Sequence, residues 1–139
     1  MTYDIVSTRR VRKTIKVTQP DDLFGFIKKY AKSRQEQFLV ITLDGAHQVI
    51  SIHLSTIGIL NSVMIHPREV FIHAIRDNAK AVMVAHNHPS GALTPSPEDK
   101  EMTERLTEAA KILGFHFLDH LIFNRYGFYS FRKEGDMAE

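Results

Sequence analysis

A short apolar segment, Ala81–Ala85, runs directly into two histidines that are separated by a single residue. Side chains two residues apart on an extended strand point the same way, so His86 and His88 are expected to project together from the end of a buried strand. Asp99 lies in the first turn of the helix expected after Ser96, and it can approach the histidines from the opposite side. Two imidazoles and a carboxylate form the ligand set of many hydrolytic zinc sites, where water takes the fourth position. The spacing therefore favours a zinc site at this junction.

The same residues also have a purely structural explanation. Ser96-Pro97-Glu98-Asp99 is a typical helix start, with a serine N-cap, a proline in the first position and acidic residues in the first turn. Capping and metal ligation are compatible, because a cap fixes the helix that presents Asp99. A lone His-x-His pair is often structural as well. Only the joint pattern, with Pro89-Ser90-Gly91 turning the chain between its parts, indicates a metal site.

Two hydrophobic periods alternate along the chain, one typical of strands and one typical of amphipathic helices. Asp44-Gly45 adds a hairpin signal. Helices interleaved with strands and hairpins predict an α/β (α+β) fold with three layers, in which helices cover both faces of a mixed sheet. The expected strands are Val11–Val17, Phe38–Leu43, Ile50–Leu54, Ala81–Ala85, Phe115–Phe123 and Phe128–Phe131, and the expected helices begin at Pro20, Pro67 and Ser96, the last ending at Leu113 before Gly114.

Composition narrows the class of protein. The chain has 139 residues, which is the size of one domain, and no apolar run approaches the ~20 residues of a membrane span, so we expect a cytoplasmic protein. It contains no cysteine, which excludes disulfides and thiolate zinc ligands. Half of its 18 Lys and Arg residues fall within the first 34 positions, a bias that either attracts nucleic acid weakly or forms a solvated surface. No aromatic residue interleaves with Arg9–Lys16, which argues against a base-stacking platform.

A zinc hydrolase also needs a carboxylate that is not a ligand, placed to move protons between water and the leaving group. Glu36 and Glu69 are the candidates. Glu69 is explained by its place in the first turn of the helix at Pro67, where a negative charge interacts favourably with the helix dipole. Glu36, just before the Phe38–Leu43 strand, has no such structural reason, so it is the favoured residue.

Four segments repeat the motifs of a known family: Pro67-Arg68-Glu69-Val70, Ala85-His86-Asn87-His88-Pro89-Ser90-Gly91, Pro95-Ser96-Pro97-Glu98-Asp99 and Leu118-Asp119-His120-Leu121-Ile122. They closely resemble the RadC proteins, a bacterial branch of the MPN/JAMM (JAB1/MPN) metalloprotease superfamily. The resemblance covers about residues 20–133. The superfamily pattern also includes an upstream glutamate, which here falls on Glu36.

The resemblance implies that His86, His88 and Asp99 bind Zn²⁺, that Glu36 is the general acid/base, and that Ser96 stabilises an oxyanion. It implies a three-layer α/β/α domain around a mixed sheet, similar to the cytidine deaminases. It also implies a metallopeptidase or isopeptidase, whose substrate is a peptide or protein with an amide bond. In that reaction zinc lowers the pKa of water toward ~7, and the hydroxide attacks the carbonyl.

Two features depart from the family. The helix-hairpin-helix segment of full-length RadC proteins has no counterpart here, so residues 1–139 are expected to form a single domain. The family usually has Gly-Thr where this chain has Gly58-Ile59 before Leu60-Asn61, which puts in doubt the contact that the threonine makes.

Other function classes are less favoured. A DNA repair-associated or nucleic-acid-processing protein is the historical label of RadC, and here only the basic first third supports it. A non-catalytic MPN interaction module is disfavoured because all three ligands are present. A nucleobase deaminase is disfavoured because the chain has no cysteine ligands.

Asp119-His120 forms a second group of polar residues. Asp119 could orient a ligand imidazole from behind, or His120 could be an auxiliary acid. We favour a structural role for both, because they lie within an apolar strand. The remaining histidines are interpreted as surface or core residues: His47, His53, His66, His73 and His116.

Overall fold

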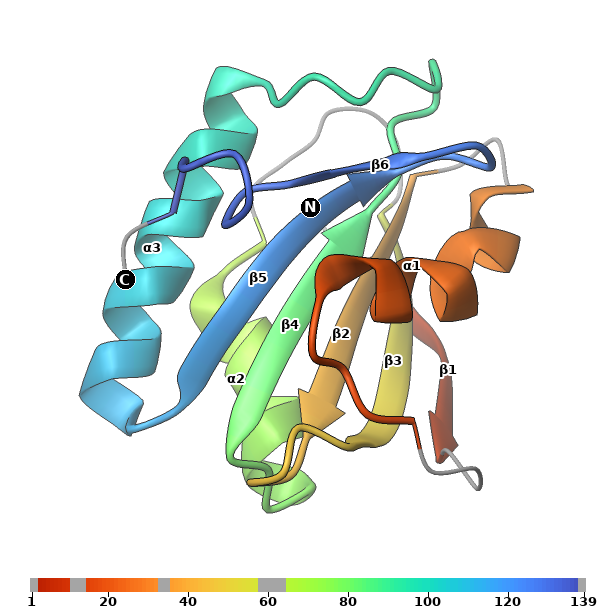
Figure 1. Cartoon of the computed structure of the whole chain (residues 1–139). Coiled ribbons are helices and arrows are strands. Elements are labelled where there is room, and N and C mark those ends of the chain that lie inside the picture. Colours follow the sequence, from red (N-terminus) through yellow and green to blue (C-terminus); the bar gives the residue numbers. More distant parts are fainter. Residues whose placement is uncertain (1–2, 11–14, 33–35, 58–64, 138–139) are drawn as a thin grey trace.

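A six-stranded mixed sheet forms the centre of the computed structural model, which describes residues 3–10, 15–32, 36–57 and 65–137 (Figure 1). Across the sheet the strand order is β1-β3-β2-β4-β5-β6. Of the described strand pairs, β4 and β5 run parallel and the others are antiparallel. The strands are β1 (Tyr3–Arg10), β2 (Gln37–Leu43), β3 (Val49–Ile57), β4 (Ala81–His86), β5 (His116–Phe123) and β6 (Phe128–Ser130).

Helices cover both faces of this sheet, as expected for three layers. Figure 1 shows α1 (Pro20–Ile27), which continues into the 3-10 helix η1 (Lys28–Lys32), on one face. On the other face lie α2 (Pro67–Arg76) and α3 (Pro97–Leu113). The predicted α/β/α architecture with a mixed sheet is therefore confirmed. None of the described helices combines the length and the apolar character needed to cross a membrane.

Successive side chains along the central strands point to opposite faces of the sheet, so each packs under the helices of one face or the other. Val82 and Val84 of β4 belong to the core under α2 and α3, whereas Met83 and Ala85 belong to the core under α1. His86 is in phase with Val84, so its ring lies on the α3 side at the end of the strand. The alternation of side chains along β4 thus places the ring of His86 on the side of the sheet where α3 begins.

The helix α3 has the boundaries that the sequence predicts. Ser96 is its N-cap and Pro97 takes the first helical position. It ends at Gly114, whose φ of 85° lies in the left-handed region that favours glycine. Because β4 and β5 are parallel, the chain needs a crossover between them, and α3 provides it.

The N-terminal part of the fold differs from the expectation of a strand over Val11–Val17. Residues 11–14 of that range lie outside the described residues, and in the described remainder only Lys16 forms an isolated bridge, to Gln48. The first strand is instead β1, which pairs with β3. A shift of register between Ile5 and Ser7 interrupts the two-residue period of β1, and this irregularity removes the sequence signal for a strand.

A buried polar cluster joins α2 to the sheet at the end remote from His86. Asp77 follows α2, and its Oδ2 accepts a hydrogen bond from Thr42 Oγ1 at 2.7 Å and lies 2.8 Å from His53 Nε2. The ring of His73 stacks on that of His53, with centroids 4.0 Å apart. Burial lowers the pKa of His73 to about 4. His53 and His73 are therefore core histidines, as interpreted from the sequence.

The depressed pKa of His73 predicts a loss of stability in acid. The unfolded chain takes up the proton near pH 6.5, whereas the folded chain takes it up only near pH 4, so stability falls as the pH decreases through this window. For this residue the loss is on the order of 3 kcal/mol. Urea unfolding across the window should show a weaker pH dependence for His73→Phe than for the wild type. His116→Phe, at an exposed histidine, is the matched control, and equal slopes for all three proteins would contradict the assignment.

Candidate metal centre

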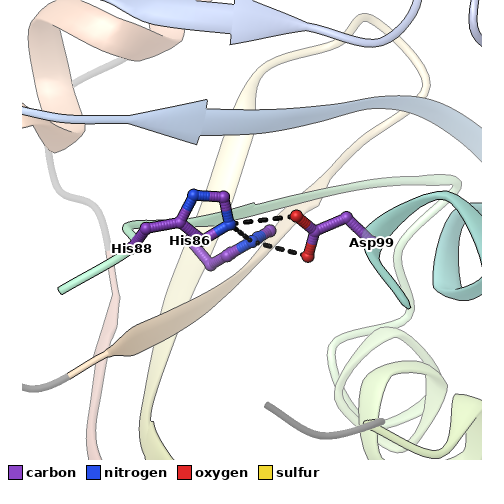
Figure 2. A group of neighbouring side chains, drawn as sticks. All are labelled: His86, His88 and Asp99. Carbon is purple, nitrogen blue, oxygen red and sulfur yellow. Dashed lines mark hydrogen bonds and ion pairs between the residues drawn. The ribbon is translucent and has the colours of Figure 1, made fainter. Parts of the chain in front are cut away.

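Three side chains from two neighbouring elements meet at one point (Figure 2). His86 is the last residue of β4, His88 follows two residues later, and Asp99 lies in the first turn of α3. His86 Nε2 is 3.1 Å from Asp99 Oδ1, and His88 Nε2 is 2.9 Å from Asp99 Oδ2. The two Nε2 atoms are 3.3 Å apart. The structure therefore brings together the three residues that the sequence analysis selects as ligands.

These separations fit one small cation. Two donors that each lie about 2.0–2.1 Å from a tetrahedral zinc ion are about 3.3 Å from each other. The two Nε2 atoms are 3.3 Å apart, and they lie 3.1 Å from Oδ1 (His86) and 2.9 Å from Oδ2 (His88) of Asp99, all close to that value. Two imidazole nitrogens and a carboxylate are also the donor types that zinc sites use. The group therefore has both the spacing and the chemistry of a metal centre.

The three side chains differ in their exposure to solvent. The side chain of His86 is 0% exposed and that of Asp99 is 8% exposed, whereas that of His88 is 18% exposed. Of the three, His88 is therefore the side chain that solvent reaches most readily.

A turn after β4 orients the ring of His88. Gly91, with φ of 84°, donates its backbone N–H to the carbonyl oxygen of His88 at 2.8 Å, which closes the turn. The carbonyl of Ala92 then lies 2.9 Å from His88 Nδ1. Because a carbonyl only accepts hydrogen bonds, Nδ1 carries the proton, and in the neutral ring Nε2 has a lone pair. Nε2 faces the Asp99 carboxylate, so the space between them suits a positive charge, either a proton on Nε2 or a metal ion that Nε2 would bind through its lone pair.

Asp99 serves the helix start and the cluster at the same time. Its backbone N–H donates to Ser96 Oγ at 3.1 Å, and its Oδ2 accepts from the Ser96 backbone N–H at 2.8 Å. Burial disfavours the charged form of Asp99, but its contacts with His86 and His88 outweigh this effect and hold the pKa of the carboxyl well below its usual range. The bond to Asp99 is also the main reason why the pKa of His88 is raised. Capping thus fixes the carboxylate that faces the histidines.

Glu36 lies near this cluster, whereas Glu69 has a capping role. Glu36 precedes β2, whose Phe38 pairs with His86 in the sheet, and its half-buried carboxyl interacts electrostatically with His86, His88 and Asp99. Burial raises the pKa of Glu36. Glu69 Oε1 instead accepts from the backbone N–H of His66 in the capping box of α2. Glu36 is therefore the candidate that interacts with the cluster, and its role as general acid/base stays a prediction.

Two residues that the sequence analysis does not select also contribute to the site. Asn87, which lies between the two histidines in the sequence, is buried. Its Oδ1 accepts a hydrogen bond from the Gln37 backbone N–H at 2.7 Å. This bond fixes the strand entrance next to Glu36. Thr103 of α3 lies behind the cluster, where its Oγ1 contacts the ring of His120 at 2.6 Å. Neither role has a local sequence signal, because each partner lies far away along the chain.

Asp119 and His120 have different surroundings, although they are adjacent in β5. Asp119 accepts hydrogen bonds from Ser130 Oγ and from the backbone N–H of Arg132, which is a structural arrangement. His120 Nε2 instead lies 2.9 Å from Nδ1 of His86. Complete burial lowers the pKa of His120 well below its ordinary value. His86, an expected ligand, is therefore contacted from behind by the imidazole of His120 and not by the carboxylate of Asp119.

The basic first third is only partly described. The side chains of Arg9, Arg10, Arg12 and Lys13 lie outside the described residues, so nucleic-acid contact through them stays a prediction. Gly58-Ile59, where the family usually has Gly-Thr, also lies outside them.

Comparison with known proteins gives consistent matches. The sequence profile of the RadC-like JAB domain matches residues 17–136. A UPF0758 protein of Methanospirillum hungatei is 44% identical over 126 residues, which cover 89% of this chain and 56% of that protein. A UPF0758 protein of Thermotoga maritima is 44% identical over 124 residues, which cover 85% and 56% of the two chains. One of Aquifex aeolicus is 36% identical over 124 residues, covering 89% and 54%. The chain thus spans a little over half the length of these curated relatives.

The capping role of Ser96 can be tested by substitution. Ser96→Ala removes the acceptor of the Asp99 backbone N–H and should lower the free energy of unfolding by about 1 kcal/mol. Ser96→Asn keeps a side-chain oxygen that can cap, so its stability should stay close to that of the wild type. Urea denaturation measures both changes.

Ser90→Ala is the matched control for this experiment. Ser90 Oγ also accepts a backbone N–H, from Ala92, but in an exposed turn outside any helix. Its removal should change stability by less than ~0.5 kcal/mol. Equal losses for Ser90→Ala and Ser96→Ala would refute the capping role.

Proposed function

Because this chain belongs to the RadC-like JAB domain family and gathers two imidazoles and a carboxylate at one point, we propose that it is a zinc-dependent hydrolase that cleaves amide bonds. The class that fits best is a metallopeptidase or isopeptidase. The proposal depends on the distances of 2.9–3.3 Å that join the two Nε2 atoms to each other and to the two oxygens of the Asp99 carboxylate. The two histidine–carboxylate distances also suit hydrogen bonds, but the approach of two Nε2 atoms to 3.3 Å beside a carboxylate is what a shared cation would favour.

His86, His88 and Asp99 would hold the ion. Imidazole donors suit zinc and neighbouring transition metals, whereas magnesium and calcium prefer oxygen donors throughout. The ion would supply Lewis acidity, which polarises a carbonyl and makes water a stronger acid. The side chains themselves keep the centre rigid, since His86 lies in a buried strand and Asp99 in a capped helix turn.

Glu36 would be the general acid/base. It takes a proton from the attacking water and later donates a proton to the leaving nitrogen. A raised pKa suits both steps, because it moves proton exchange toward neutral pH. The hydrogen bond from Gln37 to Asn87 holds the backbone next to Glu36 against the chain that joins the two histidines.

Ser96 would stabilise the oxyanion that forms on the substrate carbonyl. The backbone N–H of Asp99 uses a lone pair of Ser96 Oγ, so the single proton of the hydroxyl stays available as a donor. A donor aimed at developing negative charge lowers the barrier of acyl transfer. Capping and catalysis therefore use different parts of the same hydroxyl group.

Zinc binding by the full chain is the first test. The wild type should bind one zinc ion per chain in equilibrium dialysis, and His88→Ala or Asp99→Ala should weaken binding by more than ~100-fold, since each removes a donor. Glu36→Gln should bind as the wild type does, because Glu36 is not a ligand. His116→Ala is the matched control, because it removes an exposed histidine outside the cluster. A wild-type protein that does not bind zinc would overturn the proposal.

Amide cleavage is the second test. Zinc-loaded wild-type protein should cleave members of a peptide and isopeptide library, and Glu36→Gln should lower kcat by about 10²–10⁴-fold through loss of proton transfer. Glu69→Gln removes the other candidate carboxylate, which caps α2, and should leave kcat nearly unchanged. Absence of cleavage across the library, or equal effects of the two substitutions, would contradict the assigned chemistry.

A further inference from the structure

A hydrogen-bonded chain runs behind the metal centre, on the side away from the donor atoms. The Nδ1 atom of the fully buried His86 is 2.9 Å from Nε2 of His120. Nδ1 of His120 is 2.6 Å from Thr103 Oγ1, which in turn lies 3.0 Å from the backbone carbonyl oxygen of Asp99. The chain thus begins at one expected ligand and ends at the backbone of another.

The direction of the hydrogen bonds follows from the last acceptor. A carbonyl oxygen only accepts, so Thr103 gives its single hydroxyl proton to Asp99 and accepts a proton from His120 Nδ1. His120 is fully buried and neither of its ring partners is an acid, so the neutral ring is favoured. With the proton on Nδ1, its Nε2 has a lone pair. That lone pair accepts the proton of His86 Nδ1. The Nε2 atom of His86, which faces Asp99 and His88, is then free of a proton.

We propose that His120, oriented by Thr103, is a positioning residue that fixes the Nδ1–H tautomer of His86 and so presents the Nε2 lone pair of His86 to the metal. The inference rests on the proposed function, because the tautomer matters only if Nε2 binds a cation. Ligand histidines generally depend on such a partner at the second nitrogen. Here that partner is itself a buried histidine.

The surroundings hold both rings in place. His120 pairs with Val84 in the parallel β4–β5 register, which puts its ring on the same face as His86. The ring of Phe131 lies parallel to that of His120, at 3° and with centroids 4.3 Å apart. Phe38 stacks on His86 from β2, with centroids 6.2 Å apart. These contacts restrict rotation of the rings, so the hydrogen bonds between them select one proton arrangement.

A space-filling role for His120 is the simpler alternative, and His120→Phe separates the two roles. Phenylalanine keeps an aromatic ring against Phe131 but has no ring nitrogen. For the full chain, competition with a chromophoric zinc chelator should show zinc affinity reduced by about 10–100-fold in His120→Phe. His120→Gln restores an acceptor and a donor, so it should recover part of that loss. Thr103→Val should weaken zinc binding by about threefold or more, because His120 then loses the acceptor that sets its tautomer.

Thr107→Val is the matched control. Thr107 Oγ1 donates to the backbone carbonyl of Thr103 at 2.8 Å, one turn further along α3, and it is not part of the chain to His86. The zinc affinity of the Thr107→Val variant should stay within about twofold of that of the wild type. If His120→Phe does not fold, the comparison of Thr103→Val with Thr107→Val decides the question.

The tautomers can be observed directly by ¹⁵N NMR of the histidine rings in the zinc-loaded full chain. His86 and His120 should both carry their proton on Nδ1, and Thr103→Val should remove the single tautomer of His120. Protonation of wild-type His120 at Nε2, or a zinc affinity that His120→Phe leaves unchanged, would overturn this inference while zinc binding and the proposed function stand. A wild-type chain without zinc binding would instead overturn the proposed function, and this inference with it.

Discussion

The contact between the Asp99 carboxylate and two imidazole rings joins the end of β4 to the start of α3, and the candidate site depends on it. Each partner is placed by an independent local rule. The period of a buried strand directs His86, a glycine turn orients His88, and a capping box fixes Asp99. The three donor atoms converge because these local arrangements meet at one edge of the sheet.

The charges of these side chains indicate what the cluster could bind. The carboxylate is ionised in a poorly solvated place, and the lone pair of His88 Nε2 is directed toward it by the carbonyl of Ala92. Such a group is stable only when positive charge lies among its members. The residues behind it, from His86 through His120 to Thr103, contain no acid that would compete for that charge. The cluster could therefore hold a cation.

Much of the fold and of the candidate site could be predicted from the sequence. The features that could not be predicted were missed for one physical reason. The strands β2, β4 and β5, the helix α3 and the three donor residues follow from periodicity and capping, which are local. The strand β1 gave no clear signal, because a register shift after Ile5 interrupts its alternation. The roles of Asn87 and His120 depend on partners 50 and 34 residues away, at Gln37 and His86. Only the register between strands brings such partners together, and no local pattern encodes that register.

The turn that separates His88 from Asp99 has a thermodynamic consequence. These residues are 11 positions apart, and a cation held by both would close the intervening segment into a ring. The chain contains no cysteine, so a disulfide cannot make this link. A ligand that binds the folded state alone adds to stability by mass action. Metal supply would then control how often this segment opens, and with it the exposure of the turn to proteases.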